Sequence, residues 1–227
     1  MDIAWIWIPV TILAAAFQVG RNVIQRRLVE ELGTIGATQV RFLYGLPFAT
    51  LLVLGTLWIT GADIPHMNMD FLIFIFSGSS TQIIATAFML AAMRIGSFVV
   101  VTAYTKTEPI QVAIFGAIVL NETFSGISII AIIIASLGVI LLSTSRENKA
   151  IDKKIWSSVL MGVISGGFFA ISAVSFRGAL VSLGDDSLLV RTTWSLMCAL
   201  CIQVALLGIW MSIFQRQLYL KCFKAWQ

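Results

Sequence analysis

The sequence predicts an all-α integral membrane protein with about seven transmembrane helices, because of its composition and its long apolar runs. Of its 227 residues, 59% are hydrophobic and 11% are charged, whereas soluble domains average about 45–50% apolar and about 25% charged residues. Even large soluble domains expose much of their surface, so this apolar excess cannot be hidden from water. The runs are continuously apolar rather than alternating, which favours helices over the strands of a β-barrel.

Each predicted helix is an apolar run of about 20 residues, the length that spans the hydrocarbon of a bilayer. The seven runs cover residues 3–24, 38–59, 71–93, 97–120, 124–142, 156–182 and 187–214. The connections between them are short, and the longest basic one covers residues 146–154. This linker predicts a boundary between a first domain at 1–145 and a second at 155–227.

A weak internal repeat relates the two predicted domains. Three residues of the first copy match the second at one constant offset: Phe17 with Phe168, Arg26 with Arg177, and Gly33 with Gly184. With one residue deleted in the second copy, Arg41 also matches Arg191. Because the first copy has five helices, the second would be inverted, as in many secondary transporters. The second copy supplies only its first two helices. Three are therefore expected to be missing at the C-terminus, so that the chain is truncated or borrows them from an oligomer or a partner.

Two charged residues, Lys106 and Glu108, lie inside the apolar run 97–120. A charge in hydrocarbon costs several kcal/mol or more unless it faces a protein interior or a wet cavity. Pro109 lacks an N–H group and its ring clashes with the carbonyl of Thr105, which predicts a helix break and freed backbone groups. We expect a substrate site at this break that uses Lys106, Glu108 and the Tyr104 ring. A structural ion pair with another helix is the alternative.

Other polar residues in the runs are candidates for cavity lining. Gln18 and Asn22 share one face of the first helix, and Gln82 and Thr86 share one face of the third. Such residues commonly hold membrane helices together, at about 0.6 kcal/mol for each contact. Helix contact and substrate binding both remain open for them.

Arg41 and Arg191 lie close to the predicted membrane boundary. Long basic side chains there usually reach out to water, and a gate-forming ion pair is the alternative. Gly162 and Gly166, four residues apart, predict close packing of the sixth helix against a neighbour.

The distribution of ionisable residues limits the remaining functions. Most Lys and Arg residues lie in short loops, where they set topology and do not indicate a nucleic acid partner. Their distribution places the N-terminus outside the cell, and the membrane is expected to be a bacterial inner membrane. One histidine and three cysteines offer no zinc site, and the spans contain no paired catalytic carboxylates. Neither enzyme activity nor a metal or other cofactor is expected.

Several segments resemble one known family. They are Thr107-Glu108-Pro109 in the fourth run, the turn Asn121-Glu122-Thr123, the small-residue helix ending Ala135-Ser136-Leu137-Gly138, and Gln39-Val40-Arg41-Phe42. Together they resemble the EamA repeat of the drug/metabolite transporter superfamily. The resemblance implies a ten-helix carrier of small metabolites, built from two inverted five-helix repeats.

The sequence therefore favours a membrane transporter, either a secondary carrier or an exporter, for small metabolites such as amino acids. It would work by alternating access, with the lipid bilayer and a small solute as its partners. A seven-helix receptor or sensor and a structural membrane subunit are the alternatives. A retinal sensor would need a Schiff-base lysine in its last helix, and the run 187–214 has none.

Overall fold

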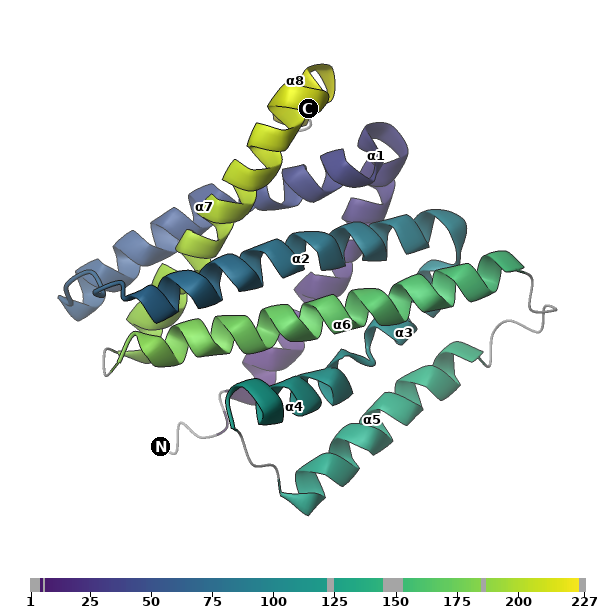
Figure 1. Cartoon of the computed structure of the whole chain (residues 1–227), viewed down its shortest axis with the longest axis horizontal. Helices are drawn as coiled ribbons and strands as arrows, with labels where there is room; N and C mark the ends of the chain where they lie inside the picture. The colour runs from purple at the N-terminus through teal and green to yellow at the C-terminus, as the bar shows by residue number, and fades with distance from the viewer. Residues whose placement is uncertain (1–4, 6, 122–124, 145–152, 185–186, 225–227) are drawn as a thin grey trace.

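The computed structural model shows a bundle of long helices (Figure 1). It describes residues 5, 7–121, 125–144, 153–184 and 187–224. Within these residues there are eight helices: α1 (Trp7–Thr60), α2 (Met69–Ile95), α3 (Phe98–Thr105), α4 (Glu108–Val119), α5 (Gly126–Thr144), α6 (Lys153–Ser182), α7 (Leu188–Phe214) and α8 (Arg216–Lys224). Glu122 and most of the predicted linker at 146–154 lie outside the described residues.

The first two predicted runs are joined in one element, α1, which bends at a single glycine. Gly33 has φ 67° and ψ 178°, a conformation that favours glycine because it has no side chain. Without the bend, the 53 residues from Ile8 to Thr60 would extend about 80 Å, more than twice the thickness of the hydrocarbon. The bend divides α1 into a first arm (residues 7–32) and a second arm (residues 34–60). The loop expected between residues 24 and 38 is thus replaced by a sharp turn.

Four helices in the described chain are long and apolar enough to cross a membrane, namely α1, α2, α6 and α7. The prediction of seven spans is therefore borne out only in part. The difference arises at three places: α1 contains two of the predicted runs, the run 97–120 is divided into α3 and α4, and α5, which covers the run 124–142, counts only as a shorter apolar helix. Gly184, which the repeat aligns with Gly33, also has a positive φ of 77° and also ends one helix before the next begins. The two-copy organisation itself stays a prediction.

The centre of the bundle is the antiparallel pair α2 and α6, which lie side by side along their length (Figure 1). Serines seven residues apart on α6 donate hydrogen bonds to backbone carbonyls of α2. The pairs are Ser158 with Ala92 at 3.3 Å, Ser165 with Ala85 at 2.8 Å, and Ser172 with Gly78 at 2.9 Å. A seven-residue spacing keeps side chains on one seam of two supercoiled helices. We call these three contacts the serine ladder.

Glycines allow the same two helices to approach closely. A Cβ atom added at Gly78 would lie 2.7 Å from the ring of Phe176, and one added at Gly178 would lie 2.8 Å from the ring of Phe74. Each helix therefore places an aromatic ring on a glycine of the other. Small residues at helix contacts in lipid increase van der Waals packing, which is a main source of helix association there.

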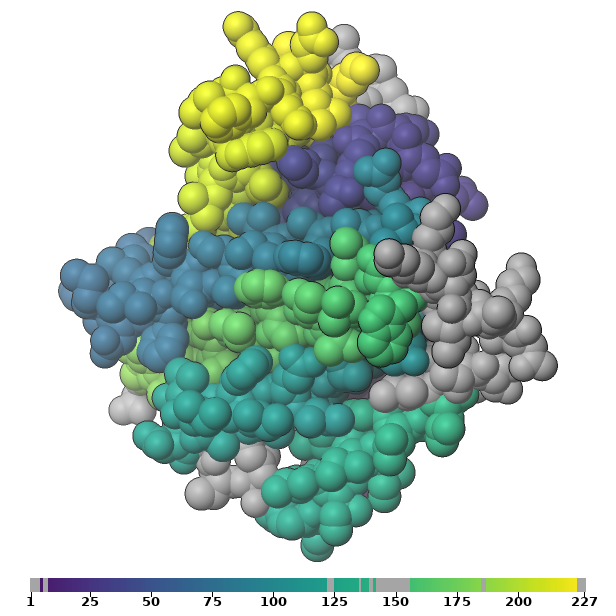
Figure 2. Space-filling view, turned by 45° about the vertical axis from the view of Figure 1, so that its right-hand side comes forward, coloured from purple at the N-terminus to yellow at the C-terminus, as the bar shows by residue number. Residues whose placement is uncertain are grey.

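The second arm of α1 packs on α7, and the short helix α8 folds back against α1. The Tyr44 hydroxyl donates to the carbonyls of Cys222 and Phe223 at 3.3 and 3.2 Å. The Cys222 side chain is fully buried, and this burial raises the pKa of its thiol. In Figure 2, α8 and the end of α7 form one end of the molecule, and α5 lies at the opposite edge.

We expect Gly96→Ala to destabilise the protein, because the new Cβ would lie 2.6 Å from Cβ of Ser158, an atom that no side-chain rotation can move. Overpacking of this kind costs about 1–3 kcal/mol. The measurement is the free energy of unfolding in mixed detergent micelles. Gly55→Ala is the matched control, since nothing lies within 4 Å of its added Cβ. Equal stability of the two variants would contradict the α2–α6 packing described above.

Candidate functional site

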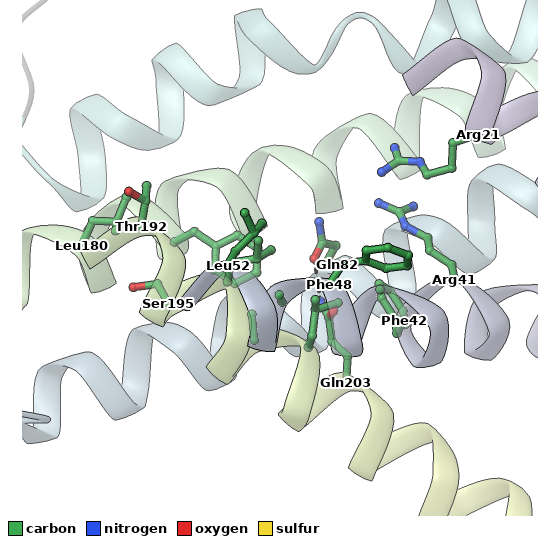
Figure 3. A pocket seen from close by; sticks show the side chains of 16 residues that line it. Arg21, Arg41, Phe42, Phe48, Leu52, Gln82, Leu180, Thr192, Ser195 and Gln203 are labelled. Atoms are coloured by element: carbon green, nitrogen blue, oxygen red, sulfur yellow. Dashed lines mark hydrogen bonds between the residues drawn. The ribbon is translucent and has the colours of Figure 1, made fainter. Parts of the chain in front are cut away.

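The main candidate for a functional site is a cavity of about 490 Å³, shown in Figure 3. It lies among the second arm of α1, α2, α6 and α7, with one residue from the first arm of α1. Most of the wall is apolar, and the apolar side chains include Phe42, Phe48, Leu52, Phe176, Leu180, Leu196 and Leu200. Cavities of this size, with apolar walls and a few polar groups, are typical of small-molecule sites.

Two arginines lie at one end of the cavity. The half-buried Arg41 donates from Nη1 to the hydroxyl of Thr86 at 3.0 Å. In Figure 3 the guanidinium of Arg21 faces that of Arg41, and the two are close enough to repel each other. Arg21 belongs to the first arm of α1 and Arg41 to the second, so the bend at Gly33 brings them together.

Two glutamines form the polar middle of the cavity. The Gln203 amide N–H donates to the side-chain oxygen of Gln82 at 2.5 Å. This contact joins α7 to α2 across an apolar environment, where an unpaired amide would cost free energy. The side-chain oxygen of Gln203 has no protein partner among the described residues. It is therefore a buried acceptor that no described group satisfies.

Hydroxyl groups lie at the other end of the cavity, as Figure 3 shows for Thr192 and Ser195. The Thr192 hydroxyl is used within its own helix, where it donates to the carbonyl of Leu188. The Ser195 hydroxyl is buried and has no partner in the described part of the chain. Buried polar atoms are normally hydrogen-bonded, so this hydroxyl is a second unsatisfied group at the cavity.

Lys106, Glu108 and Tyr104 do not line this cavity. They lie at the break between α3 and α4, where Glu108 begins α4 and Pro109 occupies its first turn, a position that proline favours. The freed backbone is partly satisfied locally. The Thr107 hydroxyl donates to the Tyr104 carbonyl at 2.8 Å, and the Gln111 amide donates to the Thr107 hydroxyl at 3.1 Å.

The glycines of α6 pack directly against this break. A Cβ added at Gly166 would lie 3.0 Å from the Thr105 carbonyl oxygen, and one added at Gly162 would lie 3.2 Å from Cβ of Tyr104. The Gly162 and Gly166 pair therefore has the packing geometry that its spacing predicts. The break faces the backbone of α6 at these positions.

The remaining candidate residues have varied surroundings. Gln18 is exposed on the first arm of α1, whereas Asn22 is buried and its side-chain oxygen has no described partner. Gln82 lines the cavity and Thr86 holds Arg41. Arg41 thus lies against the cavity rather than extending away from it. Arg191 donates to the carbonyls of Gly184 and Leu180 at 2.6 and 3.3 Å, at the C-terminal end of α6.

Four polar residues of the site were not singled out from the sequence: Arg21, Thr192, Ser195 and Gln203. Gln203 could have been predicted, because it is an amide side chain within the mostly apolar run 187–214. Polar residues in membrane spans are often functional. Arg21 lies near the end of the predicted run 3–24, where it gave no sign of belonging to a site. Its place beside Arg41 depends on the bend at Gly33, which the apolar pattern does not show.

A family model describing the EamA-like transporter family matches residues 5–144, more than half of the chain. The fold is thus that of an integral membrane protein of a transporter class. The chain belongs to the EamA-like transporter family, which is not an enzyme family. Neither a curated protein nor a solved structure matches it. Within the described residues, no group of three His, Cys, Asp or Glu side chains could hold a metal ion.

We expect Ser195→Cys to react with a negatively charged, water-soluble methanethiosulfonate reagent, because Ser195 lines the cavity and a transporter must open such a cavity to water during its cycle. The reactive species is the thiolate, which needs a polar surrounding to form. The background variant has Cys198, Cys201 and Cys222 replaced by alanine, and labelling is measured by mass shift in liposomes. Ile73→Cys is the control, since Ile73 is 60% exposed on α2 but does not line the cavity. If the two sites were labelled equally slowly, the cavity would not be open to water.

Proposed function

We propose that this protein is a secondary carrier that moves small amphipathic metabolites by alternating access through the cavity in Figure 3. The observation that carries the proposal is the origin of the cavity wall. Residues of α1 and α2, from the predicted first copy, face residues of α6 and α7, from the predicted second copy. Secondary carriers bind their substrates at such an interface between repeats.

The family match favours this function over a receptor or a structural subunit. The cavity wall supports it as well, because it combines apolar side chains with a few polar groups, namely two arginines, two glutamines and two hydroxyl residues. Amino acids remain an example of the small metabolites that such a carrier would take. The bend at Gly33 supplies a point about which the two arms of α1 would rotate.

We also propose a role for Lys106 and Glu108 in another conformation of the transport cycle. In the present structure they lie outside the cavity wall but within electrostatic range of each other. An interrupted helix is a place where transporters commonly expose polar groups. Lys106→Ala would then lower the rate of exchange across the membrane while leaving equilibrium binding at the cavity intact.

The orientation is proposed from the charges of the loops. The bend of α1 and the basic helix α8 lie together, since the Cys222 thiol contacts the carbonyl of Gly36 at 3.8 Å. This contact supports the expectation that the first basic connection and the tail share one side. By the positive-inside rule that side is cytoplasmic, which places the N-terminus outside a bacterial inner membrane.

We expect Leu200→Trp to abolish solute flux, because the larger ring would fill a cavity that Leu200 lines. The measurement is counterflow of radiolabelled carboxylates, amino acids and amines into proteoliposomes. Leu54→Trp is the matched control, since Leu54 is 59% exposed and lies outside the cavity wall. Both variants should unfold at temperatures near that of the parent. Unchanged flux through Leu200→Trp would mean that solute does not pass through this cavity.

A further inference from the structure

The arginine end of the cavity carries only positive side-chain charges, and this limits the kind of solute that it can bind. Arg21 and Arg41 place two guanidinium groups next to each other (Figure 3). Among the sixteen described residues that line the cavity, none is acidic. The site therefore contains two positive charges and no negative side chain to balance them.

We propose that the substrate is an organic anion, with a carboxylate or similar head held jointly by Arg21 and Arg41 and an apolar body along the phenylalanine and leucine wall. That the anion is transported rests on the proposed carrier function. That the anion binds does not, and binding can be tested separately. The proposal also favours anionic metabolites over the other small metabolites that a carrier of this family would take.

The hydrogen-bonding capacity of the two arginines supports an anionic head. A guanidinium has five N–H donors in a planar fork, and Arg41 uses Nη1 on the Thr86 hydroxyl. That contact fixes the orientation of the side chain and supplies no negative charge. Carboxylates and phosphates accept paired hydrogen bonds from such a fork. One anion between the two arginines would also offset their mutual repulsion.

The same geometry disfavours other solutes. A cation would be repelled by both arginines, and the apolar wall offers it no carboxylate. The ammonium group of a zwitterion would find no carboxylate in the cavity wall, because the polar side chains there other than the two arginines are neutral. Charged groups in apolar surroundings cost free energy unless they are paired. The expected order of affinity is anion, then zwitterion, then cation.

The test uses four probes of similar shape: 3-phenylpropionate, its neutral amide 3-phenylpropionamide, zwitterionic phenylalanine and cationic phenethylamine. The full chain is placed in nanodiscs of phosphatidylcholine, and displacement of radiolabelled 3-phenylpropionate is measured by scintillation proximity. We expect 3-phenylpropionate to bind at least tenfold more tightly than the amide. Addition of phosphatidylglycerol to the discs tests whether an anionic lipid head occupies the same arginines, in which case it would displace the probe.

Arg21→Gln and Arg41→Gln should each weaken 3-phenylpropionate at least tenfold and leave the amide nearly unchanged. Arg27→Gln is the matched control, because Arg27 is exposed, is close in sequence to Arg21 and does not line the cavity. Its removal lowers the net charge by the same amount. The thermal unfolding temperature of each variant shows whether the fold is retained.

The outcomes separate the substrate class from the carrier function. Equal binding of acid and amide, or equal loss of binding in Arg27→Gln and Arg41→Gln, would overturn the anion assignment. If the protein transports an amine and Leu200→Trp blocks that transport, the carrier function is supported but the anion assignment is overturned. Arginine-dependent binding of 3-phenylpropionate without any flux would support the anion site and contradict the carrier. Displacement by phosphatidylglycerol would assign the arginines to a lipid head and overturn the proposal of a small substrate.

Discussion

The close contact between α2 and α6 is the interaction on which the rest of the structure depends. The serine ladder and the two ring-on-glycine contacts fix these helices at short distance along their length. In lipid, apolar surface does not drive helices together as it does in water, so small residues and hydrogen bonds must do so. Both helices then contribute to the cavity, α2 through Gln82 and α6 through Phe176. A different face of α6, at Gly162 and Gly166, holds the break between α3 and α4.

The bend at Gly33 adds the second constraint, because it determines which charges meet. A straight α1 would place Arg21 and Arg41 about 30 Å apart along the axis. The bend instead brings both guanidinium groups to one end of the cavity. The conformation at Gly33 would be strained for other residue types, since φ lies in the left-handed region. A single backbone position therefore sets the electrostatic character of the site.

Much of the fold could be predicted from the sequence, for a simple reason. Lipid-facing helices are apolar along their whole length, so α2, α6 and α7 begin and end close to the predicted runs. The same uniformity hides the cavity, because a helix that is apolar all round does not mark which face points inward. Arg41 illustrates this limit. Its position near a boundary predicts a side chain that reaches water, but its contact with Thr86 depends on how α1 packs against α2.

The break at Lys106 shows the opposite limit, where a strong signal pointed away from the cavity. Charges and a proline in an apolar run correctly mark irregular backbone, since such a backbone must find partners other than lipid. The sequence does not show which groups pair with this irregular backbone. Here Thr107 and Gln111 supply them from within the segment, and α6 covers the break with glycine.

The two arms of α1 connect binding to movement. Arg21 and Arg41 lie on opposite sides of the Gly33 bend, so any solute that contacts both would stabilise one angle between the arms over others. A ligand shifts a conformational equilibrium only by its difference in affinity between the states. An anion held by both arginines has such a difference, because rotation of one arm would separate its two partners. A solute bound only by the apolar wall would lack it, and would occupy the cavity without favouring either conformation.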